Sequence, residues 1–197
     1  MTIKEVRHLT TDFNLEFRDV DGGTRPIIEG YALKFNRQSE LLGDWFTETI
    51  DAEALRNTDM SDVVALFNHN DDKPLGRAGV NLELEVDNIG LRFVVQPPQT
   101  SYAADVIENM RSGIIKQCSF AMSDIESEWS ESEKEGIYSR KITNIGKIWD
   151  VSIVTSPAYK DTEAVIGARS KEKVEKLLFH DTRKDAIRKK IIESSLY

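Results

Sequence analysis

Apolar and polar positions alternate along much of the chain, which is typical of strands buried on one face. Short alternating stretches occupy residues 3–18, and a turn signal at Asp21-Gly22-Gly23 separates them from a second predicted strand at 27–35, so we expect an antiparallel hairpin. Further strands are predicted at residues 63–67, 80–86, 91–96, 114–122, 137–145 and 148–155. Residues 71–74 are predicted to form a turn, and the acidic stretch 123–136 an exposed hairpin end or loop.

Three segments have helical spacing instead. Apolar residues recur every three or four positions over residues 100–111, and Gly113 lies just past the end of this helix. Residues 51–57 predict a short capped helix, and residues 171–192 carry an apolar stripe that predicts a tail helix. Many short strands and few helices predict an α+β, mainly β fold, as a β-barrel or sandwich with peripheral helices and a helical C-terminal tail.

The charge distribution divides the chain in two. The 197 residues include 34 acidic and 26 basic side chains, and the net charge of −8 would repel nucleic acid and anionic lipid. Residues 169–197 contain nine basic and five acidic side chains, whereas the rest is strongly acidic. We therefore predict a main domain at 1–168 and a basic amphipathic helical tail at 169–197. No apolar run approaches the ~20 residues that a transmembrane helix needs, which excludes that class of membrane protein.

Three polar residues occupy positions suited to chemistry. His69 ends an apolar run just before a predicted turn, Ser119 lies on the small, polar face of a predicted strand with room for a substrate, and Asp150 interrupts an apolar strand. Each also has an ordinary interpretation, since most histidines are not catalytic and polar residues often line the wet face of a strand. The alternation places Trp149 with Val151 and Ile153, and Asp150 with Ser152.

Together, His69, Ser119 and Asp150 could form a serine-hydrolase triad, since a serine hydroxyl needs a base and the base needs an orienting group. The absence of a Gly-x-Ser-x-Gly motif disfavours an ordinary α/β-hydrolase. A cysteine hydrolase that uses Cys118 with His69 is a competing hypothesis, but strand alternation points Cys118 towards the core. As the only cysteine, Cys118 excludes an internal disulfide and a cysteine-based zinc cluster, and three histidines leave few options for a metal site.

An ordered series of short motifs runs from Glu29 to Thr162. It comprises Glu29-Gly30-Tyr31-Ala32-Leu33-Lys34-Phe35-Asn36, Phe46-Thr47-Glu48-Thr49-Ile50, Val64-Ala65-Leu66-Phe67-Asn68-His69-Asn70, Leu75-Gly76-Arg77, Gly90-Leu91-Arg92-Phe93, Arg111-Ser112-Gly113, Cys118-Ser119-Phe120, Asp150-Val151-Ser152-Ile153-Val154-Thr155-Ser156-Pro157-Ala158-Tyr159 and Asp161-Thr162. In this order, the series resembles the prohead maturation proteases of tailed bacteriophages, a family similar in fold and chemistry to the herpesvirus assemblin proteases.

The resemblance implies specific roles for the three polar residues. His69 is expected to be the general base, Ser119 the nucleophile and Asp150 the orienting member of the triad. Two positions depart from the common pattern of the family, in which Asp150 is often glutamate and Ala121 is often glycine. An assemblin-like β-barrel is the fold that the resemblance implies, and no metal or cofactor is required.

The resemblance also implies a biological role. The protein is expected to be a serine endopeptidase that cleaves scaffold segments, tails of the major capsid protein, or its own tail, inside an assembling procapsid in the host cytoplasm. The similarity to assemblins favours a homodimer, and neither nucleic acid nor a membrane is an expected partner. The alternative is a non-enzymatic scaffold or capsid assembly factor, which would also explain the acidic body and the basic tail.

Overall fold

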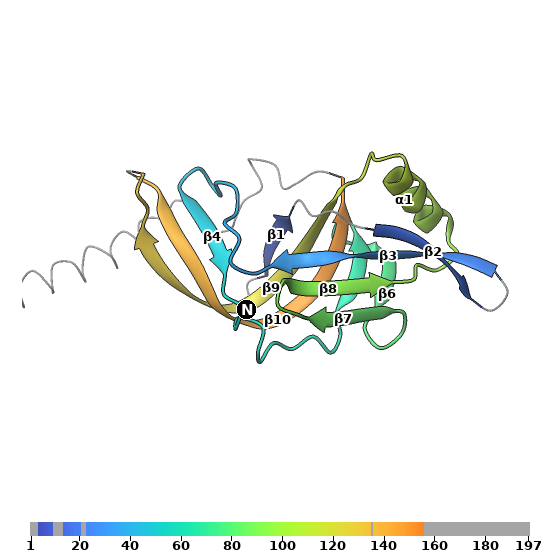
Figure 1. Ribbon diagram of the computed structural model, residues 1–197, viewed down its shortest axis with the longest axis horizontal. Coiled ribbons are helices and arrows are strands. Elements are labelled where there is room, and N and C mark those ends of the chain that lie inside the picture. The colour runs from blue at the N-terminus through green and yellow to red at the C-terminus, as the bar shows by residue number, and fades with distance from the viewer. Residues whose placement is uncertain (1–3, 10–13, 21–22, 135, 156–197) are drawn as a thin grey trace, which may run out of the picture.

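The computed structural model describes residues 4–9, 14–20, 23–134 and 136–155 (Figure 1). The elements are β1 (Glu5–Leu9), β2 (Asn14–Val20), β3 (Gly23–Lys34), β4 (Phe46–Ile50), β5 (Val64–Phe67), β6 (Asn70–Arg77), β7 (Leu82–Val86), β8 (Gly90–Val95), α1 (Ser101–Arg111), β9 (Gln117–Glu131) and β10 (Tyr138–Val154). This confirms the α+β, mainly β class. The predicted tail helix and the domain boundary after residue 168 lie outside the described residues. Within the described part, no helix is long and apolar enough to cross a membrane.

Two sheets form the fold. A six-stranded sheet has the order β1-β9-β10-β5-β6, with β4 also paired to β10, and a four-stranded sheet has the order β2-β3-β8-β7. The predicted N-terminal hairpin is present as the antiparallel pair β2–β3. Figure 1 shows β9 and β10 as the longest ribbons, with one end beside the four-stranded sheet and the other end projecting with β4.

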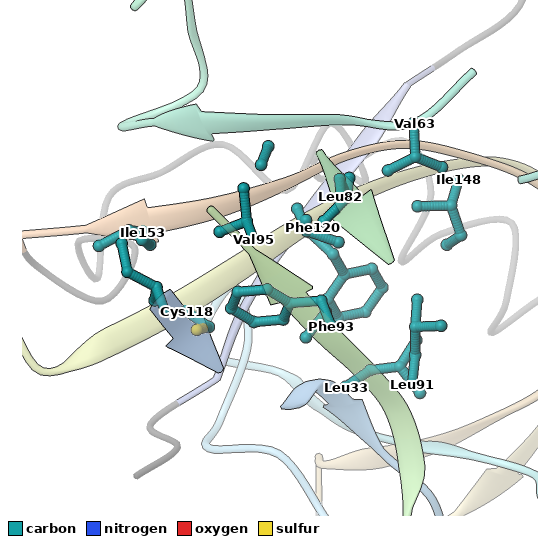
Figure 2. Packing of buried hydrophobic residues seen from close by; sticks show 14 of the residues in the cluster. Leu33, Val63, Leu82, Leu91, Phe93, Val95, Cys118, Phe120, Ile148 and Ile153 are labelled. Carbon is teal, nitrogen blue, oxygen red and sulfur yellow. The ribbon is translucent and has the colours of Figure 1, made fainter. Parts of the chain in front are cut away.

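The core lies between the two sheets. Phe93 of β8 and Phe120 of β9 are each 2% exposed, and Cys118 is fully buried beside them. Figure 2 shows these side chains with Val95 and Ile153, which come from β8 and β10. Burial of a phenylalanine side chain stabilises the fold by about 1.5–3 kcal/mol, so the alternating apolar residues fix how the sheets stack.

The predicted helix at residues 51–57 is wrong, because this segment forms consecutive turns. The backbone N–H groups of Ala54 and Arg56 donate to carbonyl oxygens only three residues earlier. The carbonyl of Ala54 instead accepts a hydrogen bond from the N–H of Ile145 at 2.9 Å. A helix this short is marginal by itself, so bonding to β10 decides its conformation.

The predicted turn at residues 71–74 is also wrong, because these residues lie within β6. The chain reverses earlier, at Asn68 and His69. Pro74 is tolerated in β6 because this strand lies at the edge of its sheet and its pairing with β5 shifts register there. The acidic stretch predicted as a hairpin end or loop is mostly strand, since β9 continues to Glu131, and the two predicted strands after it are one strand, β10.

Three buried charged residues and the half-buried Glu5 fasten β1 to the sheet. Arg7 of β1 donates from Nε and Nη2 to the two carboxylate oxygens of Glu48 at 2.7 and 2.9 Å. Arg140 of β10 also donates to Glu48 at 3.0 Å and to Glu5 at 2.8 Å. The cluster thus joins β1, β4 and β10, and Arg7, Glu48 and Arg140 are each less than a tenth exposed.

We expect Glu48→Gln to lower the free energy of unfolding by about 3 kcal/mol or more, because two buried guanidinium groups would lose their shared charge partner. Glu53→Gln is the matched control, since Glu53 pairs with Arg56 in an exposed ion pair that contributes little to stability. Urea denaturation of the three proteins measures the difference. Equal midpoints for Glu48→Gln and the wild type would show that the cluster does not anchor β1.

The same cluster makes stability depend on pH. Burial disfavours charge on Glu5, but hydrogen bonding to Arg140 and the charges of Arg7 and Arg140 outweigh it and lower the pKa of Glu5. A carboxyl with a lowered folded pKa stabilises the fold above its unfolded pKa of about 4.3, and this contribution is lost as the pH falls through the folded value.

Candidate active site

His69 lies at the tip of the β5–β6 hairpin. Phe67 pairs with Asn70, which leaves Asn68 and His69 as the two central residues of the turn, with φ values of 54° and 53°. Positive φ at both central positions defines a type I′ turn, in which asparagine is favoured first and glycine second. His69 occupies the glycine position, and a side chain in this backbone region costs about 1 kcal/mol or more.

Asn68 fastens the turn to the end of β10. Its backbone N–H donates to the carbonyl of Ile153 at 2.9 Å, and its Oδ1 accepts a hydrogen bond from the N–H of Thr155 at 3.0 Å. The same strand carries Asp150, so these bonds fix the distance between the histidine and the carboxylate.

For the peptidase activity that the family resemblance predicts, we expect Asn68→Gly to lower kcat/KM about 10-fold, because glycine keeps the positive φ but loses the Oδ1 acceptor that ties the turn of His69 to the end of β10. Asn68→Ala should lose the same acceptor and be about 1 kcal/mol less stable than the glycine variant, because alanine is strained at this φ. Peptide cleavage and thermal unfolding of both variants separate the two effects. Wild-type kcat/KM in both variants would refute a positioning role for Asn68.

Ser119 and Asp150 lie on neighbouring antiparallel strands. Ser119 of β9 pairs with Ser152 of β10, and Ala121 pairs with Asp150. Directly opposed residues project to the same face, so these four side chains share one face of the sheet. Cys118 projects to the other face and lies in the core, as the strand alternation predicts.

A β-bulge at Trp149 sets this arrangement. The pairing of β10 with β9 passes from Ile148 to Asp150 and skips Trp149. Ile148 is buried in the core, Trp149 is 38% exposed, and Val151 is buried again. The prediction that Trp149 shares a face with Val151 and Ile153 is therefore wrong, because the extra residue resets the alternation.

The three predicted site residues meet over this face. Nδ1 of His69 lies 2.5 Å from Oδ1 of Asp150, and Nε2 lies 2.5 Å from Oγ of Ser119. The chain of contacts therefore runs from hydroxyl to imidazole to carboxylate, which is the geometry that base-assisted nucleophilic attack requires. Ser119 and Asp150 are 50 and 81 positions away from His69 in the sequence, so the fold alone brings the three residues together.

The carboxylate of Asp150 is buried and held at both oxygens. Ser152 Oγ donates to Oδ1 at 2.8 Å, and the Lys4 ammonium lies 2.8 Å from Oδ2. Burial by itself would raise the pKa of Asp150, but the hydrogen bond and charge of His69, followed by those of Lys4, outweigh it and hold the pKa below its ordinary value. Asp150 therefore stays ionised at neutral pH.

Strand β1 covers the serine. The backbone carbonyl of Arg7 accepts a hydrogen bond from Ser119 Oγ at 2.7 Å, and Ser119 is fully buried, whereas the side chain of His69 is 18% exposed. The prediction that Ser119 faces room for a substrate is therefore wrong for this conformation. The hydroxyl has one proton and faces two acceptors, the carbonyl of Arg7 and Nε2 of His69, so it can donate to only one of them at a time.

Sequence reasoning missed two groups in this site. Lys4 lies far from Asp150 in the sequence, and no local pattern connects them. Ser152 had a signal, since strand alternation places it on the same face as Asp150. Within the described ranges, no group of three or more histidine, cysteine, aspartate or glutamate side chains is arranged to hold a metal ion.

Comparisons with known proteins add an independent observation. The family model described as caudovirus prohead serine protease matches residues 13–177. No curated protein matches the sequence. Among solved structures, the capsid assembly protease gp21 of bacteriophage T4 is similar at 11% identity, with a TM-score of 0.46, over 78% of this chain and 99% of that chain. Because the family model spans most of the sequence, this chain belongs to the prohead serine proteases of the tailed bacteriophages.

Proposed function

We propose that Ser119, His69 and Asp150 are the catalytic triad of this serine endopeptidase of procapsid maturation. The observation that carries the proposal is the continuous contact chain, in which the imidazole lies 2.5 Å from both the hydroxyl and the carboxylate. Membership of the family supplies the reaction class, and the geometry supports the assignment of roles.

The proposed reaction is acyl transfer. Ser119 Oγ attacks the carbonyl carbon of the scissile peptide while His69 Nε2 takes the hydroxyl proton. His69 then gives this proton to the leaving amine, and the acyl group remains as an ester on Ser119. A water molecule, deprotonated by His69, hydrolyses the ester and restores the enzyme. Asp150 stabilises the imidazolium that forms in both steps.

The proposed substrates are scaffold segments and tails of the major capsid protein, inside the assembling procapsid of the infected cell. Cleavage within the basic tail 169–197 is a further part of the proposal, as is a homodimer. Neither nucleic acid nor a membrane takes part in the proposed reaction. Family membership supports a role beside capsid and scaffold proteins.

Co-expression with the capsid and scaffold proteins of the same phage tests this function. We expect the wild type and Cys118→Ala to process these proteins, with the new termini identified by mass spectrometry, and Ser119→Ala to leave them intact. Cleavage that depends on Cys118 would favour the cysteine hydrolase. Intact proteins with the wild type, together with normal particle formation, would favour a non-enzymatic assembly factor.

A further inference from the structure

Ser152 contacts two members of the site without being one of them. It lies on β10 opposite Ser119 and is 2% exposed. Its Oγ donates to Asp150 Oδ1 at 2.8 Å and lies 3.2 Å from His69 Nδ1. The hydroxyl thus stands at the junction between the imidazole and the carboxylate.

The protons at this junction can be assigned from the contacts. If Nδ1 carries the ring proton, His69 and Ser152 each donate one hydrogen bond to Asp150 Oδ1, and both donors are satisfied. If Nδ1 is bare, its lone pair faces a carboxylate oxygen at 2.5 Å, and Ser152 can donate to only one of the two. The arrangement therefore favours the tautomer that leaves the lone pair of Nε2 facing Ser119.

Ser152 differs from the other group that holds Asp150. The side chain of Lys4 is 44% exposed and contacts Oδ2, so water and salt screen its pull on the carboxylate. Ser152 is buried and contacts Oδ1, the oxygen that His69 uses. A buried hydrogen bond to a charged group is stronger than an exposed one, so Ser152 is the firmer anchor for that oxygen.

We propose that Ser152 is a positioning residue of this protease, whose hydroxyl fixes the carboxylate of Asp150 and thereby keeps His69 in the tautomer that can accept the proton of Ser119. The proposal rests on the triad described under Proposed function. It assigns Ser152 no contact with the substrate.

The kinetic test compares Ser152→Ala with Ser123→Ala. Ser123 is a matched control, because it is also buried and its Oγ also joins two side chains: it donates to Asp124 and accepts from Trp149, neither of which is a member of the triad. We expect kcat to fall about 10- to 100-fold in Ser152→Ala with KM nearly unchanged, which corresponds to the loss of one hydrogen bond to a charged group. Ser123→Ala should keep the wild-type kcat even if its melting temperature falls.

Two further variants separate the loss of the hydroxyl from a loss of stability. Ser152→Thr keeps the hydroxyl and should retain most of the wild-type kcat. Ser152→Cys replaces the hydroxyl by a weak donor of similar size, and it should reproduce the fall in kcat if the alanine variant is too unstable to measure.

A spectroscopic test does not depend on turnover. In protein labelled with ¹⁵N-histidine, the ring nitrogen shifts report which nitrogen carries the proton, and His69→Gln identifies the signals of His69. We expect mainly the Nδ1–H form in the wild type and Ser123→Ala, and a larger Nε2–H fraction in Ser152→Ala. Wild-type kcat and tautomer in Ser152→Ala would overturn the proposal. Full peptidase activity in His69→Gln would instead refute the triad itself. The ring nitrogen shifts would then still show whether Ser152 sets the tautomer of His69.

Discussion

Replacing Ser119 by alanine is expected to lower kcat/KM for a cleaved peptide by about 10⁴- to 10⁶-fold, because the acyl group then has no oxygen to which it can transfer. His69 and Asp150 stay in place in this variant, but they have no hydroxyl proton to move. Stability should change little through packing, since only one oxygen is removed, although the carbonyl of Arg7 loses its hydrogen bond. Cleavage of a synthetic peptide that spans an identified processing site gives the rate.

The matched control is Cys118→Ala, which alters the preceding residue on the same strand. Cys118 is fully buried in the core, so its loss should lower the melting temperature without lowering kcat. A Ser119→Ala enzyme with kcat/KM within a factor of 10 of the wild type would show that another group is the nucleophile.

Replacing Asp150 by asparagine is expected to lower kcat by about 10²- to 10⁴-fold, because the neutral amide neither stabilises an imidazolium nor fixes its tautomer. The carboxylate oxygens accept from Ser152 on one side and contact Lys4 on the other. An amide has a single acceptor oxygen, so one of these donors must face an NH₂ group. When the NH₂ group faces His69 Nδ1, it favours the Nε2–H tautomer, which cannot accept the proton of Ser119.

Asp150→Glu is the companion variant, because it keeps the carboxylate charge and lengthens the side chain by one methylene. We expect its kcat to lie between those of the wild type and Asp150→Asn. The lowered pKa of Asp150 also sets a pH dependence. The stability that its charge contributes is present above its unfolded pKa of about 3.9 and is lost as the pH falls through the lower folded value. An asparagine variant with undiminished kcat would remove Asp150 from the triad.

Local patterns predicted much of this fold because alternation and helix capping act over a few residues. The helix at 101–111 and the inward position of Cys118 follow from such patterns. The helix expected at 51–57 failed because hydrogen bonds to β10, more than 80 residues away, replaced those of a helix. The turn predicted at 71–74 was wrong because the chain reverses at Asn68 and His69 instead. This tight turn contains no glycine, so no turn signal was visible there in the sequence.

The candidate site likewise combines residues that could be named from the sequence with features that depend on tertiary pairing. His69, Ser119 and Asp150 could be named from the sequence with the help of family motifs, and the fold brings them together. The bulge at Trp149 and the contact of Lys4 with Asp150 depend on tertiary pairing, which no local pattern encodes. The cover that β1 provides over Ser119 likewise arises from pairing between distant strands.

Labelling the nucleophile with a covalent probe tests the account most directly. Capsid, scaffold and protease can be co-assembled in the presence of a fluorophosphonate, which reacts only with a serine that a base activates, and the labelled residue can be identified by peptide mass spectrometry. We predict a single adduct on Ser119, which disappears in His69→Ala although the protein remains folded. An adduct on a different residue, or one that forms on Ser119 equally fast without His69, would contradict the proposed catalytic triad.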